Sequence, residues 1–152
     1  MAQAQKQVRI IEPLERFVNR INLIGCYARV SSDSEDQLNS YNNQVDFYES
    51  YVNSLENSKL VKIYTDERIT GTRMDKRDGF LQMIEDCRKG LINTIITKSI
   101  SRFARNITET LSVVRELKSI GVSVYFMTEK IDTAKMGSEM MLAVYAACAE
   151  IE

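Results

Sequence analysis

The chain has 152 residues, of which 44% are hydrophobic and 27% are charged, and its formal net charge is −1. These values are typical of one soluble globular domain and exclude wholesale disorder. The complete absence of histidine excludes Ser-His-Asp catalysis, Cys-His catalysis and His-ligated zinc. No segment approaches the roughly 18 consecutive apolar residues of a membrane span. Three widely spaced cysteines favour a reducing cytoplasm over a disulfide framework.

Residues 1–20 are polar, and we expect them to form an N-terminal extension. Residues 22–28 predict a strand buried on both faces, and capping-box spacing at Ser32 and Ser34 predicts a helix from there to about Leu55. Further strands are predicted over residues 60–65, 93–97 and 122–127. Helices are predicted over residues 78–89, from Asn106 to just before Gly121, and over 136–152, with a mobile loop over 66–77.

This alternation of strands and helices predicts an α/β domain with a mostly parallel sheet of about four to five strands, flanked by helices. Ligands of such sheets bind beyond the carboxyl ends of the strands. The first three predicted strands are followed by residues 29–32, by Asp66 and Glu67, and by residues 98–105. We therefore expect a hydroxyl, a carboxylate and several arginines to meet at one edge of the sheet.

The charge distribution places a net charge of +3 in residues 66–105, which include six arginines. Charge alone favours a solvated face with ordinary ion pairs. Arg102 and Arg105 would share a helical face, however, and a phosphodiester is a natural anion for two adjacent guanidinium groups. A serine beside them could attack the phosphorus, with its proton passing to Asp66 or to the substrate, or with its pKa lowered by the arginines.

Each of these residues also has a purely structural interpretation. Ser31 and Ser32 precede a predicted helix and could cap it. Arg102 and Arg105 could pair with surface carboxylates, and Asp66 could belong to a turn at the end of a strand. Cys26 is predicted to be a core residue, and the residues at steps of four near the end of the chain predict an apolar helical stripe: Met136, Met140, Val144 and Cys148.

Three motifs, taken together and in this order, resemble the catalytic domain of the serine recombinases, the resolvase–invertase superfamily. The segment from Tyr27 to Ser31 (YARVS) resembles the nucleophile motif of that family. Thr65-Asp66, Ile69-Thr-Gly71 and Lys76-Arg77 together resemble a second block. Residues 98–106 (KSISRFARN) are similar to a third and look most like the large serine recombinases, or integrases, of phages and mobile elements. The resemblance covers roughly residues 21–152.

The resemblance implies a three-layer resolvase-like fold and a site-specific DNA recombinase. Ser31 would attack a phosphodiester of double-stranded DNA and form a 5′-phosphoserine link, followed by strand exchange and religation without a metal or another cofactor. The scissile phosphate would be bound by Arg29, Arg77, Arg102 and Arg105, with Gln37 and Lys98 as further phosphate-binding residues. Asp66 would orient an arginine or help in proton transfer. We also expect Arg77 to lie away from the site when DNA is absent.

One position departs from the family pattern. Many small family members have Asp immediately before the first arginine of the third motif, where this chain has Ser101. The departure weakens any assignment of an acid or base to this position.

The family assembles into dimers and tetramers through a helix that begins where the final segment of this chain lies. The resemblance therefore implies that Met136, Met140, Met141, Val144 and Cys148 form an interface as well as core. The chain has no basic tail, zinc ribbon or helix-turn-helix. We expect it to be a catalytic fragment that ends within a helix, is inactive in recombination alone, and lacks the C-terminal region that reads the DNA sequence.

Two classes other than a recombinase can be compared with this sequence. A non-catalytic DNA-phosphate-binding or assembly module on the same scaffold would be expected to have lost part of the set formed by Ser31 and the four arginines, and none is lost. A phospho-acceptor signalling domain would need clustered acidic residues after the first strand. Arg29, Val30 and Ser31 stand there instead, which excludes that class.

Overall fold

The computed structural model describes residues 21–31, 34–68, 77–104, 106–135 and 137–151, without the side chains of residues 31–40, 68, 146 and 149–151. The extension predicted over residues 1–20 and the greater part of the predicted loop, residues 69–76, lie outside the described residues.

The described residues form one sheet in the order β2-β1-β3-β4-β5. Its strands are β1 (Asn22–Ser31), β2 (Ser58–Arg68), β3 (Thr94–Thr97), β4 (Ser123–Phe126) and β5 (Ile131–Asp132). Neighbouring strands are parallel except β5, which is antiparallel to β4. The helices are α2 (Ser34–Asn53), α3 (Asp78–Arg88), α4 (Ile100–Phe103), α5 (Ile107–Ser119) and α6 (Ser138–Ile151). The predicted mostly parallel sheet with flanking helices is confirmed.

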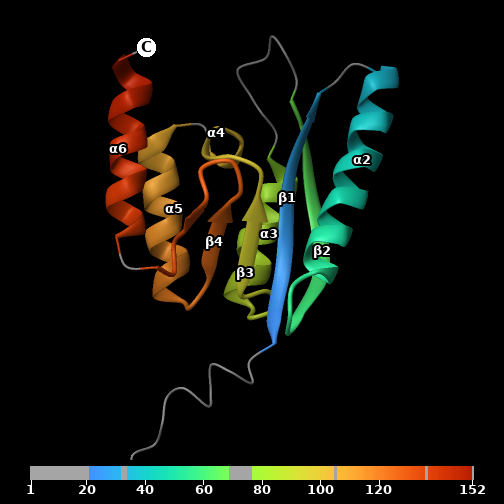
Figure 1. Cartoon of the computed structure of the whole chain (residues 1–152), viewed down its shortest axis with the longest axis horizontal. Helices are drawn as coiled ribbons and strands as arrows, with labels where there is room; N and C mark the ends of the chain where they lie inside the picture. The colour runs from blue at the N-terminus through green and yellow to red at the C-terminus, as the bar shows by residue number, and fades with distance from the viewer. Residues whose placement is uncertain (1–20, 32–33, 69–76, 105, 136, 152) are drawn as a thin grey trace, which may run out of the picture.

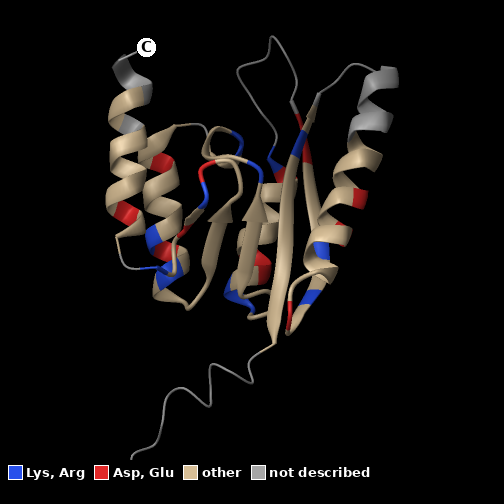
Figure 2. Cartoon of the chain, in the orientation of Figure 1, with Lys and Arg blue, Asp and Glu red and all other residues tan. Residues whose placement is uncertain are grey.

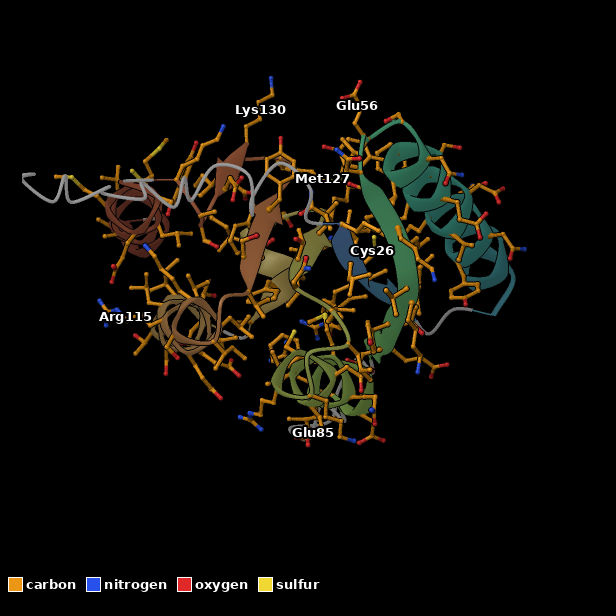
Figure 3. All side chains as sticks on the ribbon, turned by 90° about the horizontal axis from the view of Figure 1, so that it is seen from below. Cys26, Glu56, Glu85, Arg115, Met127 and Lys130 are labelled. Atoms are coloured by element: carbon orange, nitrogen blue, oxygen red, sulfur yellow. The ribbon has the colours of Figure 1, made fainter. Side chains whose placement is uncertain are left out.

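The molecule has three layers, with the sheet between α2 on one face and α3 and α5 on the other (Figures 1 and 3). Helix α6 packs beside α5 at the β5 end of the sheet (Figure 1). Glu85 of α3 and Arg115 of α5 lie on the outer sides of their helices (Figure 3). Among the described residues, no helix combines the length and apolarity needed to cross a bilayer.

Strand β1 supplies side chains to both hydrophobic clusters because successive residues of a strand point to opposite faces. Ile24, Cys26 and Ala28 pack in the cluster under α2, whereas Tyr27 packs in the larger cluster under α3 and α5. Cys26 is fully buried, which confirms its predicted place in the core. Burial raises the pKa of its thiol to about 12 and keeps it protonated.

The predicted helix ends are confirmed where local chemistry determines them. The Asn106 side chain accepts a 2.8 Å hydrogen bond from the Glu109 backbone N–H and caps α5. Gly90 and Gly121 follow the ends of α3 and α5 with φ values of 77° and 80°, a conformation that favours glycine.

Three expectations require correction. Residues 66–68 are strand rather than loop, because β1 and β2 continue to pair as far as Ser31 and Arg68. The short α4 and β5 were not predicted, and the last helix begins at Ser138 rather than at residue 136. The expectation that the apolar residues near the end of the chain are core is wrong for Met140, Met141, Val144 and Cys148 of α6, which are exposed, whereas Leu142 of the same helix is buried. Met136 lies outside the described residues.

Candidate active site

The carboxyl ends of β1, β2 and β3 meet at one edge of the sheet, at the top of Figure 1. Arg29 of β1 lies opposite Asp66 of β2, and Ser31 lies opposite Arg68. Tyr27, four residues before Ser31, pairs with Thr97, the last residue of β3. Lys98 follows β3 and is exposed. The backbone of Ser31 therefore stands at the edge predicted from the sequence.

Arg102 lies beside the end of β1, although it is 73 residues away along the chain. Its Nη1 donates a 3.4 Å hydrogen bond to the backbone oxygen of Arg29, and its side chain is exposed. The start of α4 is also held by Glu129, whose carboxylate accepts hydrogen bonds of 3.3 Å from the Ile100 backbone N–H. This arrangement presents a solvent-accessible guanidinium group near the start of the Arg29–Ser31 segment.

Positively charged residues occur at this edge, toward the end of β1, after β3 and in α4 (Figure 2). Arg29, Lys98 and Arg102 supply the described positive charges there. The edge also carries acidic groups, because Asp66 and Glu67 lie near the carboxyl end of β2. Glu129 adds a further carboxylate beside the start of α4. Arg29, Lys98 and Arg102 are the described groups at this edge that would attract an anion.

Asp66 is buried and its carboxylate accepts three hydrogen bonds. Oδ2 accepts one of 2.7 Å from the Tyr27 hydroxyl and one of 2.9 Å from the Phe80 backbone N–H, and Oδ1 accepts one of 2.8 Å from the Gly79 N–H. Asp66 thus caps the N-terminus of α3 from a neighbouring strand. Glycine is needed at position 79, where a Cβ atom would lie 2.4 Å from the backbone oxygen of Thr65.

Tyr27 connects this cap to the rest of the edge. Burial and the hydrogen bond to Asp66 raise the pKa of its phenol, so the hydroxyl stays protonated and serves as a donor. Its backbone oxygen accepts hydrogen bonds of 3.1 Å from the Tyr48 hydroxyl and 3.3 Å from the Thr97 hydroxyl. Tyr27 therefore fixes β1 against α2, β3 and, through Asp66, α3.

Arg77, the residue before α3, points into the protein rather than toward solvent, with 7% of its surface exposed. Its Nη1 pairs with Glu109 Oε1 at 3.1 Å, and its Nη2 donates to the backbone oxygen of Phe103. Its guanidinium carbon lies 3.9 Å from the ring centre of Phe80. These contacts join the start of α3 to the end of α4 and the start of α5.

The structure brings together the predicted residues Arg29, Asp66, Lys98 and Arg102 and the backbone of Ser31. It places Arg77 behind them, and Arg105 and the side chains of Ser31 and Gln37 lie outside the described residues. Three further residues organise the site without having been singled out for it: Tyr27, Glu109 and Glu129. Glu109 stands three residues after Asn106 in a capping sequence, which is a local signal for a helix start and gives no indication of its pairing with Arg77.

Among the described residues, no group of three or more cysteine, aspartate, glutamate or histidine side chains could hold a metal ion. The described edge carries guanidinium, ammonium, hydroxyl and carboxylate groups.

Comparison with known proteins gives a consistent picture. A family model described as the resolvase N-terminal domain matches residues 24–152. The Tn552 transposon resolvase of Staphylococcus aureus is 31% identical over 134 residues, which are 83% of this chain and 57% of the relative. The serine recombinase gin of Escherichia phage Mu is 29% identical over 87 residues, which are 57% of this chain and 44% of gin. This chain thus spans about half the length of these relatives.

Solved structures show the same fold. A resolvase family site-specific recombinase from Streptococcus pneumoniae has a TM-score of 0.67 and 26% identity, covering 86% of this chain and 87% of that one. The N-terminal catalytic domain of TP901-1 integrase has a TM-score of 0.64 and 22% identity, covering 86% of this chain and 95% of that domain.

Proposed function

We propose a function from the premise that this chain belongs to the resolvase N-terminal domain family of serine site-specific recombinases. Residues 21–152 would be the catalytic domain of an enzyme that cleaves and rejoins double-stranded DNA of a mobile element. The observation that carries the proposal is the position of Ser31 at the end of β1, with Arg29 two residues before it and the exposed Arg102 bonded to the Arg29 backbone. This supports the proposal, because a serine and two arginines that could serve as nucleophile and phosphate-binding groups stand at one edge.

In the proposed reaction the Ser31 oxygen attacks a DNA phosphorus. A bond forms between that oxygen and the phosphorus, and the bond from phosphorus to the 3′ oxygen breaks. The serine proton leaves, and the departing 3′ oxygen takes up a proton to become a hydroxyl. The 5′-phosphoserine retains the energy of the phosphodiester, so the reverse attack by a 3′ hydroxyl on an exchanged strand reseals the DNA without a nucleotide cofactor.

The arginines would stabilise the additional negative charge on the phosphate oxygens in the transition state. The positions of Arg29 and Arg102 support this role, and Arg77 and Arg105 complete the proposed set, with Gln37 and Lys98 as further phosphate contacts. We assign Asp66 to positioning rather than to proton transfer, because three donors occupy its carboxylate. Its hydrogen bonds hold the start of α3, directly after Arg77.

Helix α6 is the proposed contact between copies of the protein in a dimer or tetramer. Its exposed apolar residues support this: 75% of Met140, 50% of Met141, 58% of Val144 and 43% of Tyr145 are exposed. A row of large apolar side chains in solvent is typical of an interaction surface. We place the reading of the target sequence outside residues 21–152.

Covalent capture tests the proposal. The complete protein is incubated with DNA that carries the ends of its genetic element and quenched in denaturant, and protein attached to DNA 5′ ends is mapped by mass spectrometry. We expect an adduct on Ser31 that is absent from the folded Ser31→Ala variant. An undiminished adduct in Ser31→Ala would refute the nucleophile assignment. Specific DNA binding without any adduct would instead favour a non-catalytic phosphate-binding module.

A further inference from the structure

Arg77 is expected to bind the scissile phosphate, yet its guanidinium group is buried behind the edge. It is bound by the Glu109 carboxylate and the Phe103 backbone oxygen and stacks on Phe80. With 7% of its surface exposed, the side chain in this position cannot bind a DNA backbone that approaches from solvent. The two roles of Arg77 therefore require two positions of its side chain.

The buried position leaves one hydrogen-bond donor unused. Arg77 Nε is buried and has no hydrogen-bond partner among the described residues. A buried donor without an acceptor is destabilising, so the guanidinium group is held there chiefly by its other contacts. Among them Glu109 supplies the negative charge, and a buried cation that loses its charged partner becomes strongly unfavourable. Glu109 is consequently the contact that decides how firmly Arg77 is retained.

We propose that Glu109 is a positioning residue that withholds Arg77 from the active site until a DNA phosphate replaces the carboxylate. The inference rests on the proposed function and adds to it a mode of regulation. Carboxylate and phosphate both accept the paired N–H groups of a guanidinium, so the exchange replaces one anionic partner with another. Because of this exchange, Arg77 joins the other three arginines of the site only when DNA is bound. Cleavage by a site that still lacks Arg77 is thereby limited.

The substitution Glu109→Gln removes the negative charge of this contact. Glutamine has nearly the same shape, and the cap of α5 uses the backbone N–H of residue 109, which the substitution retains. Glu116→Gln is the matched control, because Glu116 also lies on α5 and pairs with an arginine, Arg88, at 2.6 Å on an exposed surface. Both variants lose one negative charge from the same helix, but only one of them changes the contact with Arg77.

The first measurement is the rate of covalent adduct formation by the complete protein. We expect Glu109→Gln to raise this rate about tenfold, the effect of one hydrogen bond between charged groups, and Glu116→Gln to leave it unchanged. In an Arg77→Ala background, Glu109→Gln should have no effect. A rate in Glu109→Gln that is unchanged or lower than that of the wild type would overturn the proposal.

The second measurement does not depend on cleavage. The Arg77 Nε–H resonance of the ¹⁵N-labelled chain, assigned by comparison with Arg77→Lys, should exchange with solvent at least several-fold faster in Glu109→Gln than in the wild type or Glu116→Gln. Equal exchange in all three proteins would overturn the withholding role even if no variant forms an adduct. Faster exchange without any adduct would support the role of Glu109 while refuting the proposed chemistry.

Discussion

The Tyr27 hydroxyl donates a 2.7 Å hydrogen bond to Asp66, and so joins the strand that carries Arg29 to the first turn of α3. The Asp66 carboxylate in turn accepts hydrogen bonds from the Gly79 and Phe80 N–H groups of α3. Arg77 directly precedes this turn and reaches α4 and α5, so hydrogen bonds connect β1 to the segment that carries this arginine. Buried contacts of Tyr27 and Asp66 thus connect the elements that carry the residues of the site.

Tyr27→Phe should weaken this connection while retaining the ring packing. We expect a loss of about 1–3 kcal/mol in the free energy of unfolding, because a buried acceptor loses a partner. We also expect slower adduct formation, because the start of α3 is less firmly held. Denaturant titration measures the first effect, and single-turnover covalent capture measures the second.

Tyr64→Phe is the control for Tyr27→Phe. The Tyr64 hydroxyl donates a 2.5 Å hydrogen bond to a different buried carboxylate, that of Asp86, and this bond also joins the sheet to α3. Tyr64→Phe should lower the free energy of unfolding by a similar amount without slowing adduct formation. If both variants slow the reaction equally, the effect of Tyr27 is one of general stability, and its positioning role is wrong.

Arg102→Ala should reduce adduct formation by about 100-fold or more, the typical effect of removing one donor that stabilises a transition state. Its free energy of unfolding should change little, because the side chain is exposed. Arg88→Ala removes an equally charged side chain, 52% exposed, that pairs with Glu116 on the outer surface. Normal cleavage by Arg102→Ala, measured beside this control, would remove Arg102 from the site.

The double variant Met140→Lys and Val144→Lys should dissociate the oligomer of the complete protein without unfolding the domain, since both side chains are exposed on α6. Sedimentation velocity would show a shift toward monomer, and circular dichroism would show an unchanged helix content. Leu81→Lys, on the exposed face of α3 (63% exposed), introduces the same residue elsewhere and should leave assembly intact. Unchanged assembly of the double variant would exclude this face of α6 as the interface.

The sequence by itself determined the order of the main strands and helices, the parallel sheet and the edge at which the site residues meet. These features follow from local signals: apolar runs, the Asn106 cap, and glycines at positions 90 and 121. The three motifs also stand at strand ends, and the topology of a parallel sheet brings such ends together whatever the details of packing.

The tertiary structure alone decided which of these residues face solvent and which partners they bind. Arg77 meets Phe103 and Glu109, which are 26 and 32 residues away, and Asp66 meets Tyr27 across 39 residues. Met140, Val144 and Cys148 have the periodicity of a core helix, yet they are exposed because α6 packs at the end of the sheet beside α5 rather than over a face. Local patterns report that a side chain is apolar or charged, whereas burial and pairing depend on what the rest of the chain places next to it.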